Sequence, residues 1–273
     1  MKKYFIIILL LSIAFLSTAF FLKNDIKQTK NIFFASNPAI ASLIKAIVGD
    51  VGSVKVIGFN NGNFHNHVIQ PDVVEELKTA KILFFLSKNN EPSLYGIINK
   101  NDINSADIFD KSNVHFWLSA LETELVLDAI FQKLTLLMPE QKTIFDKNYD
   151  LSKQKLHNLP QYSFDDKIFF GIHDAYYYLK TDYKLNYCSE LSDHHEHGLL
   201  PKNLSKMIDI AKMQKICLLF DINEEIKIAQ EIKNKNINIA GIDSDGITIE
   251  YNKGIDGYIE YFIANINIIK DCI

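Results

Sequence analysis

Apolar and polar positions alternate in blocks along the chain, and most blocks have a clear period. Six short apolar runs have the length and composition of buried β-strands: 31–36, 54–59, 80–87, 167–172, 215–221 and 237–243. Between them, apolar residues recur every three or four positions, as in amphipathic helices, over 39–49, 72–80, 119–137, 175–183, 203–213 and 224–235. Strands that alternate with helices in this way predict an α/β fold, with parallel sheets covered by helices on both faces.

The alternation is interrupted once, by a long polar segment with helical character. Pro139 and Glu140 open this segment as residues of a helix amino terminus do, and Pro160 ends it. We therefore predict two lobes, 31–138 and 161–273, joined by one long backbone helix over 139–160. A single large sheet with a long crossover is the alternative.

The amino-terminal segment predicts export from the cytoplasm. Lys2 and Lys3 precede an apolar run that ends near residue 22, which is the pattern of a secretory signal. Small residues up to Ala19 are suited to cleavage there. The alternative is an uncleaved anchor, because the apolar run approaches the roughly 20 residues that span a bilayer. In both cases the folded part is expected in the periplasm or outside the cytoplasm, retained at the membrane if the segment is uncleaved.

Composition narrows the possible partners only slightly. The 273 residues suffice for two domains, and 29 basic against 33 acidic residues give a formal net charge of -4. This balance argues against a polyanion as partner. We expect a monomer that binds no nucleic acid.

Four residues that could bind a metal ion fall just beyond predicted strands. They are His65, His115, His173 and Asp243. Ligands of open parallel sheets bind outside the carboxyl ends of the strands, so these residues are expected in one crevice between the lobes. Three imidazoles and a carboxylate suit Zn²⁺. In the alternative reading the histidines are hydrogen-bonded loop residues and Asp243 forms a turn, and His67 could replace or supplement His65.

Two further groups of residues leave more than one interpretation open. His194, His195 and His197 form a cluster that could hold a second zinc ion weakly, or could belong to a solvated loop. An exported chain favours disulfides, but the spacing of Cys188, Cys217 and Cys272 allows any pair.

At its histidine motifs the chain resembles the solute-binding proteins of metal-uptake ABC transporters, especially the zinc-specific ZnuA-like group. His65 precedes Pro71, which opens a helix, by six residues. His115 is followed by a tryptophan in VHFWL, and His173 stands in GIHDAYYYL. The segment IDSDG, with Asp243, resembles a fourth motif of the family. The resemblance covers residues 31–273.

The resemblance implies a receptor that captures Zn²⁺ outside the cytoplasm and hands it to the permease of an ABC transporter. It implies His65, His115 and His173 as zinc ligands, with Asp243 favoured as the fourth, and a disulfide between Cys217 and Cys272. Manganese-selective relatives have a carboxylate in place of the third histidine, so a histidine there favours zinc.

The chain also departs from the family pattern. Phe64 and Val114 stand where members have proline, and Phe64 cannot act as the Glu ligand of some zinc members. The long His-rich loop of many zinc members is absent. A manganese-binding relative, or an adhesin with the same fold, is therefore an alternative. A zinc hydrolase is a weaker one, because the chain lacks an HExxH motif, and we expect binding without catalysis.

Overall fold

The structure is a computed structural model, and it describes residues 31–57, 69–164, 167–172, 174–193, 196–222 and 236–272. The predicted export segment and the helix predicted over 224–235 lie outside these residues. None of the helices in the described part of the chain is long and apolar enough to cross a membrane.

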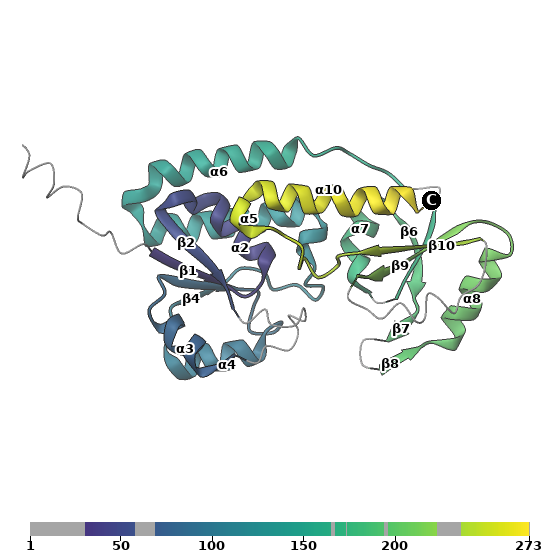
Figure 1. Ribbon diagram of the computed structural model, residues 1–273, viewed down its shortest axis with the longest axis horizontal. Helices are drawn as coiled ribbons and strands as arrows, with labels where there is room; N and C mark the ends of the chain where they lie inside the picture. Colours follow the sequence, from purple (N-terminus) through teal and green to yellow (C-terminus); the bar gives the residue numbers. More distant parts are fainter. Residues whose placement is uncertain are drawn as a thin grey trace, which may run out of the picture. The chain divides into compact units, whose positions relative to one another are not determined.

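The first sheet has four strands in the order β2-β1-β3-β4 (Figure 1). The strands are β1 (Asn31–Ala35), β2 (Gly52–Val56), β3 (Ile82–Phe85) and β4 (Ser105–Asp107). β1 pairs with β3, and β3 with β4, in parallel. Of these strands only β4 was not predicted, because its sequence SAD contains no apolar run.

The second sheet also has four strands, in the order β10-β9-β5-β6. The strands are β5 (Ile168–Gly171), β6 (Asn186–Glu190), β9 (Ile216–Asp221) and β10 (Ile237–Ile242), and every pair is parallel. A separate antiparallel pair contains β7 (Ser192–Asp193) and β8 (Glu196–Leu199). Two parallel sheets in one chain confirm the predicted α/β fold.

Helices occupy most of the remaining described residues. The α-helices are α2 (Pro38–Val48), α3 (Pro71–Lys78), α4 (Pro92–Asn101), α5 (Ala120–Leu137), α6 (Lys142–His157), α7 (Tyr177–Asp182), α8 (Pro201–Ala211) and α10 (Ile255–Asp271). The 3-10 turns are η1 (Gly49–Val51), η2 (Phe116–Leu118), η3 (Pro139–Gln141), η4 (Asp174–Tyr176) and η5 (Tyr251–Lys253). The predicted linking helix is thus η3 followed by α6, which lies between the two sheets in sequence. The bounds of the predicted lobes remain a prediction.

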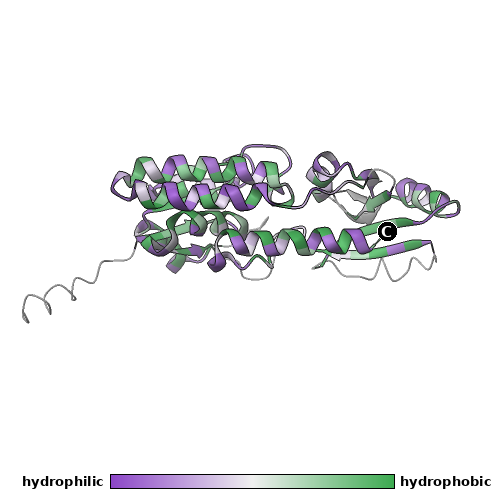
Figure 2. Ribbon diagram, turned by 90° about the horizontal axis from the view of Figure 1, so that it is seen from above, coloured by the Kyte–Doolittle hydropathy of each residue, from purple (hydrophilic) through white to green (hydrophobic). Residues whose placement is uncertain are grey.

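Each sheet has an inner and an outer face, because successive side chains of a strand point in opposite directions. Phe84 faces an inner core that also contains Phe169 and Cys217 of the second sheet. Phe85, the next residue of β3, belongs to an outer cluster with α3 and α4. Phe170 belongs to a third cluster, which α8 covers. The long helices are banded with polar and apolar residues, as one-sided burial requires (Figure 2).

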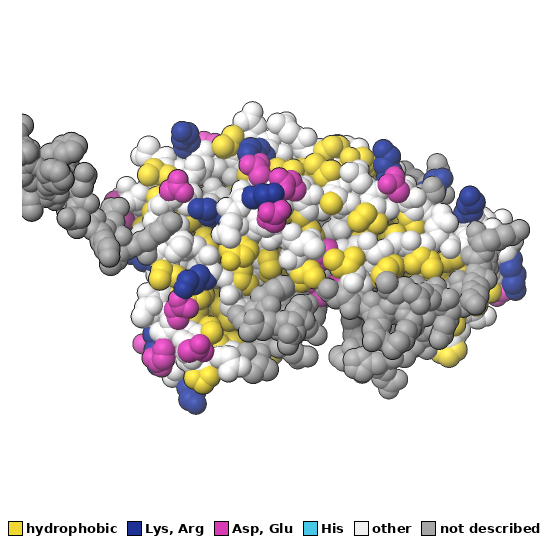
Figure 3. All heavy atoms as spheres, viewed as in Figure 1, with side chains coloured by type: hydrophobic (Ala, Val, Ile, Leu, Met, Phe, Trp, Pro, Cys, Tyr) yellow, Lys and Arg dark blue, Asp and Glu magenta, His cyan; other side chains and the backbone are white. Residues whose placement is uncertain are grey.

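Helix α10 packs against other helices and against an edge strand of the second sheet. It contacts α2 and α6 as well as β10, and it runs alongside α6 in Figure 1. A disulfide joins Cys217 in β9 to Cys272, the residue that follows α10, with 5.8 Å between the Cα atoms. This is the pair that the family resemblance implies. On the face seen in Figure 3, lysines and carboxylates are interspersed and not segregated by sign.

Candidate metal site

In sequence, His115 follows β4 and Asp243 follows β10, which are both edge strands, and each sheet also contains a point where the strand order reverses. In the first sheet β1 lies between β2 and β3, and in the second sheet β5 lies between β9 and β6. Such a reversal opens a crevice at the carboxyl ends of the strands, where open α/β sheets bind ligands. In sequence, His173 comes two residues after Gly171, the last residue of β5. His115 comes after β4, in the segment that enters α5.

Asn113 fixes which nitrogen of His115 carries the ring proton. The His115 side chain is buried, with 4% of the residue exposed. Oδ1 of Asn113 accepts a hydrogen bond from the His115 backbone N–H at 3.1 Å, and it lies 3.1 Å from Nδ1 of the ring. Because an amide oxygen only accepts, Nδ1 carries a proton, and in the neutral imidazole Nε2 then carries the lone pair. Nε2 is therefore the nitrogen suited to a metal ion.

Trp117 joins the His115 segment to the turn that follows β10. Its indole ring is fully buried and lies edge-on to the His115 imidazole, with 5.5 Å between ring centroids. The indole Nε1–H donates to the backbone oxygen of Ser244 at 2.8 Å. Ser244 in turn donates from its backbone N–H and its Oγ to Oδ2 of Asp221, at 2.9 and 2.6 Å. These bonds hold a loop of the first sheet against a turn of the second.

Asp243 stabilises this turn through both its backbone and its side chain. Its carboxylate accepts from the backbone N–H of Ile247 at 3.1 Å, and from the N–H and Oγ1 of Thr248 at 2.6 Å each. Its backbone oxygen accepts from Tyr261 at 2.7 Å and from Asn265 at 3.0 Å. Burial raises the pKa of the Asp243 carboxyl, although the bonds from Thr248 and Ile247 act in the opposite direction. The position thus has the turn-forming contacts of the alternative reading, and its predicted role as a ligand stays a prediction.

The carboxylate that faces His115 belongs to Asp245, which sequence reasoning missed. Oδ1 of Asp245 lies 3.9 Å from Nε2 of His115, and 17% of the Asp245 side chain is exposed. The next residue, Gly246, has φ of 72°, where a side chain is strained. A Cβ at Gly246 would also lie 3.4 Å from the Trp117 ring. A glycine after the second aspartate of IDSDG was the signal for a tight turn that presents Asp245.

The other predicted ligands cannot be placed in the same way. His65, His67, His173, His194 and His195 lie outside the described residues. His197 belongs to β8, but its side chain is not described. Across the described ranges there is no group of three or more His, Cys, Asp or Glu residues that could hold a metal ion. The described part of the candidate site is therefore His115, Asp243 and Asp245.

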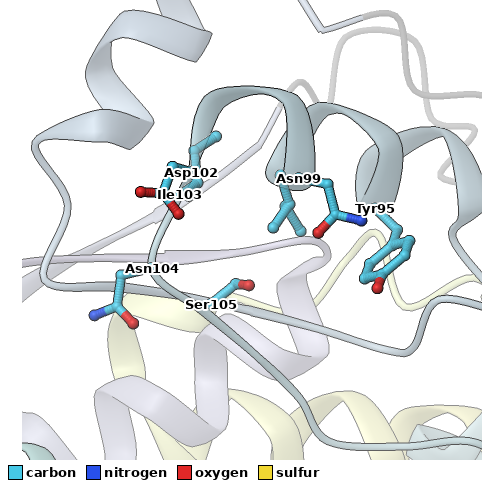
Figure 4. Close-up of a pocket in the computed structure, with 7 residues that line it drawn as sticks. Tyr95, Asn99, Asp102, Ile103, Asn104 and Ser105 are labelled. Carbon is cyan, nitrogen blue, oxygen red and sulfur yellow. The ribbon is translucent and has the colours of Figure 1, made fainter.

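A surface pocket of about 480 Å³ lies elsewhere in the first sheet, at the amino end of β4 (Figure 4). Polar side chains line most of it: Tyr95, Asn99, Asp102, Asn104 and Ser105, with Ile98 and Ile103. The pocket contains none of the predicted metal ligands, and it is at the opposite end of β4 from the segment that leads to His115. It adds nothing to the candidate metal site.

Comparison with known sequences identifies a family. The family described as zinc-uptake complex component A, periplasmic, matches residues 34–272. A putative metal-binding protein of Chlamydia trachomatis serovar D is 24% identical over 203 residues, which are 67% of this chain and 72% of that protein.

Comparison with solved structures gives the same fold. Zn(II)-bound AdcA from Streptococcus pneumoniae is 19% identical with a TM-score of 0.70, over 89% of this chain and 57% of that one. The chain therefore spans little more than half the length of AdcA. FpvC from Pseudomonas aeruginosa, in complex with Mn²⁺, is 18% identical with a TM-score of 0.71, over 89% and 98% of the two chains. The laminin-binding protein Lbp of Streptococcus pyogenes is 19% identical with a TM-score of 0.71 and the same coverage.

The match to the family covers nearly the whole described chain, and the fold agrees with it. The chain therefore belongs to the family of zinc-uptake complex component A, a group of metal-binding solute-binding proteins of transport systems and not of enzymes.

Proposed function

We propose that the protein captures Zn²⁺ outside the cytoplasm and delivers it to the permease of an ABC transporter. The observation that supports this proposal is the 3.9 Å approach of His115 Nε2 and Asp245 Oδ1, two side chains of types that bind zinc, which come from segments that follow different sheets. Imidazole nitrogens with a carboxylate are a donor set that suits zinc better than harder cations, which prefer oxygen. His65 and His173 would complete the site with an aspartate of the turn after β10.

If segments from both sheets bind the ion, the bound protein can differ in structure from the metal-free protein. An ion held by His115 and the turn after β10 stabilises the arrangement in which these segments lie together, and a permease can recognise that arrangement. The inner core packs against both sheets, so a large hinge rotation would have to divide it. We therefore expect binding to produce a small adjustment of the segments 113–118 and 243–250.

Metal binding by histidine variants tests the proposal. We expect the wild type to bind one tight equivalent of Zn²⁺ in competition with a metal indicator. His115→Ala and His173→Ala should each lower the affinity by at least about 100-fold, since outer partners of ligands already contribute 10–100-fold. His157→Ala is the matched control, because His157 is exposed on α6 and its Nε2 lies 2.8 Å from Glu124. Wild-type affinity in both His115→Ala and His173→Ala would rule the site out.

The relatives supply the competing functions. FpvC was solved with Mn²⁺, and Lbp is described as laminin-binding. The ion that this protein prefers and its role in transport or adhesion therefore need separate tests. Tighter binding of Mn²⁺ than of Zn²⁺ would favour a manganese receptor. Failure of the gene to restore growth under zinc chelation, with zinc binding intact, would favour an adhesin. The cluster His194, His195 and His197 predicts a second, weaker zinc equivalent, which the triple alanine variant should lose.

A further inference from the structure

We propose that the surface pocket between α4 and the amino end of β4 binds a small organic cation, an aliphatic primary amine whose ammonium group is held by Asp102. This site is separate from the candidate metal site, and it does not depend on the proposed function. The pocket has a volume of about 480 Å³, within the range of roughly 300–1,000 Å³ that small-molecule sites occupy. All the residues that line it belong to the described part of the chain.

Asp102 occupies a position where an aspartate lowers the stability of the fold. It caps the carboxyl end of α4 in the left-handed conformation, with φ of 52° and ψ of 44°, where glycine or asparagine is the usual residue. Its negative charge also lies at the negative end of the helix dipole, where cationic side chains are favoured. Because both effects are unfavourable, a ligand explains the carboxylate better than the stability of the turn does.

The electrostatic environment at this end of the pocket favours a cation. Within the described ranges, no ion pair and no side-chain hydrogen bond occupies the Asp102 carboxylate. The carboxyl end of α4 adds partial negative charge. Nδ2 of Asn104 donates to the backbone oxygen of Lys81 at 2.6 Å, which leaves Oδ1 of Asn104 as an acceptor. An ammonium group, with three donors and no acceptor, matches these oxygen atoms.

The rest of the pocket provides contacts for a carbon chain. Figure 4 shows the Tyr95 ring at one end and Asp102 at the other, with Asn99 between them. Tyr95 and Asp102 are seven residues apart, which is about 10 Å along the helix axis. Ile98 and Ile103, each 5% exposed, also line the pocket. A chain of several methylene groups can therefore lie against apolar side chains while its ammonium group reaches Asp102.

A sugar is the competing occupant, because polar side chains beside an aromatic ring also suit a ligand rich in hydroxyl groups. The charge of Asp102 distinguishes the two, since a hydrogen bond between two charged groups is stronger than one from a neutral hydroxyl. A free amine and the side chain of a lysine on another protein share the chemistry of the ammonium group. The test therefore includes both.

Titration of the purified protein with n-pentylamine, followed through the backbone amide signals in NMR spectra, tests the proposal. With a metal chelator present, we expect the amides of residues 99–105 to shift, with a dissociation constant on the order of 1 mM at low ionic strength. Asp102→Asn should weaken binding at least about 10-fold, and Tyr95→Ala should weaken it less. Asp150→Asn, which removes an exposed carboxylate of α6, is the matched control and should bind as the wild type does.

The stability of Asp102→Asn separates a lost ligand contact from a damaged fold. This variant should unfold at a higher urea concentration than the wild type, because asparagine suits the left-handed conformation and removes the unfavourable charge. Wild-type affinity in Asp102→Asn, or binding of n-pentanol or glucose as tight as that of n-pentylamine, would overturn the proposal. Binding of n-pentylamine alone supports a free amine, whereas tighter binding of a Gly-Lys-Gly peptide with blocked ends supports a lysine of a partner protein.

Discussion

In hydrophobic packing, the inner and outer faces of each sheet differ more from one another than the first sheet differs from the second. The inner faces share one core, in which residues of β1 and β3 pack with residues of β5 and β9 around α2, α5 and α10. The outer faces have separate small clusters, one under α3 and α4 and the other under α8. The two sheets therefore share one hydrophobic core on their inner faces, whereas each has its own hydrophobic cluster on its outer face.

This difference bears on function because the candidate site is built on the inner core. Phe116 and Trp117, the two residues that follow His115, belong to that core. Ile242, which precedes the turn after β10, and Tyr258 in α10 also belong to it. The outer clusters contain none of these residues. We infer that the geometry of His115 and Asp245 depends on the inner core, and that the outer layers can be altered with less effect on the site.

Substitution of two neighbouring phenylalanines of β3 tests the comparison with the largest expected effect on the free energy of unfolding. Phe84 is fully buried on the inner face, and Phe85 is 3% exposed on the outer face, stacked on the partly exposed Tyr95. Phe84→Ala should lower the free energy of unfolding by about 4 kcal/mol, and Phe85→Ala by about 3 kcal/mol or less, because Tyr95 can move into the space. Urea unfolding followed by circular dichroism measures both values. An equal or larger loss for Phe85→Ala would remove the distinction between the faces.

Cysteine variants test the same comparison, with a smaller expected loss in the free energy of unfolding. The Cys217–Cys272 bridge ties α10 to β9 within the inner core and closes 55 residues of chain. The Cys217→Ala/Cys272→Ala variant should therefore lose about 2–4 kcal/mol, and a reducing agent should have the same effect on the wild type. Cys188 is the matched control, since its thiol is free and packs on the outer cluster. Cys188→Ala should cost about 1 kcal/mol or less, and a loss as large as that of the double variant would contradict the comparison.

The apolar content of each strand explains which strands could be predicted from sequence. β3, β5 and β9 lie inside the sheets and carry apolar side chains on both faces, so each reads as a continuous apolar run. The edge strands differ among themselves: β2 and β10 contain apolar runs and could be predicted, whereas β4 and β6 read SAD and NYCSE, which no hydrophobic pattern marks as strands. α4 was missed because PSLYGIINKN turns only Leu94 and Ile98 fully inwards.

The candidate site was predictable only in part, for a different reason. His115 could be found from its place after a strand and from the family motif. Asp245 could not, because the pattern IDSDG contains two aspartates, and only the three-dimensional structure shows that Oδ1 of Asp245 lies 3.9 Å from Nε2 of His115. The bonds from Thr248 to Asp243 depend on the three-dimensional path of the turn. Sequence spacing does not reveal that path.

The outer surface of the α5–α6 pair should show the smallest effect. Glu124 in α5 accepts from Lys153 at 2.7 Å and lies 2.8 Å from His157, both in α6. Partial burial acts to raise the pKa of Glu124, but hydrogen bonds from Lys153 and His157 outweigh it, so the pKa lies below its ordinary value of 4.5. A lowered carboxyl pKa contributes stability above the ordinary pKa, and this contribution is lost as the pH falls through the lowered value.

Glu124→Gln should accordingly lower the free energy of unfolding at neutral pH by about 0.5–1 kcal/mol, because a partly exposed ion pair is screened by water. The difference from the wild type should shrink as the pH falls below the ordinary glutamate range. Urea unfolding across this pH range measures it, with Glu140→Gln in the exposed turn η3 as the control. A loss as large as that of Phe84→Ala, or one independent of pH, would mean that charges on the helix surface and not the shared apolar core hold this layer together.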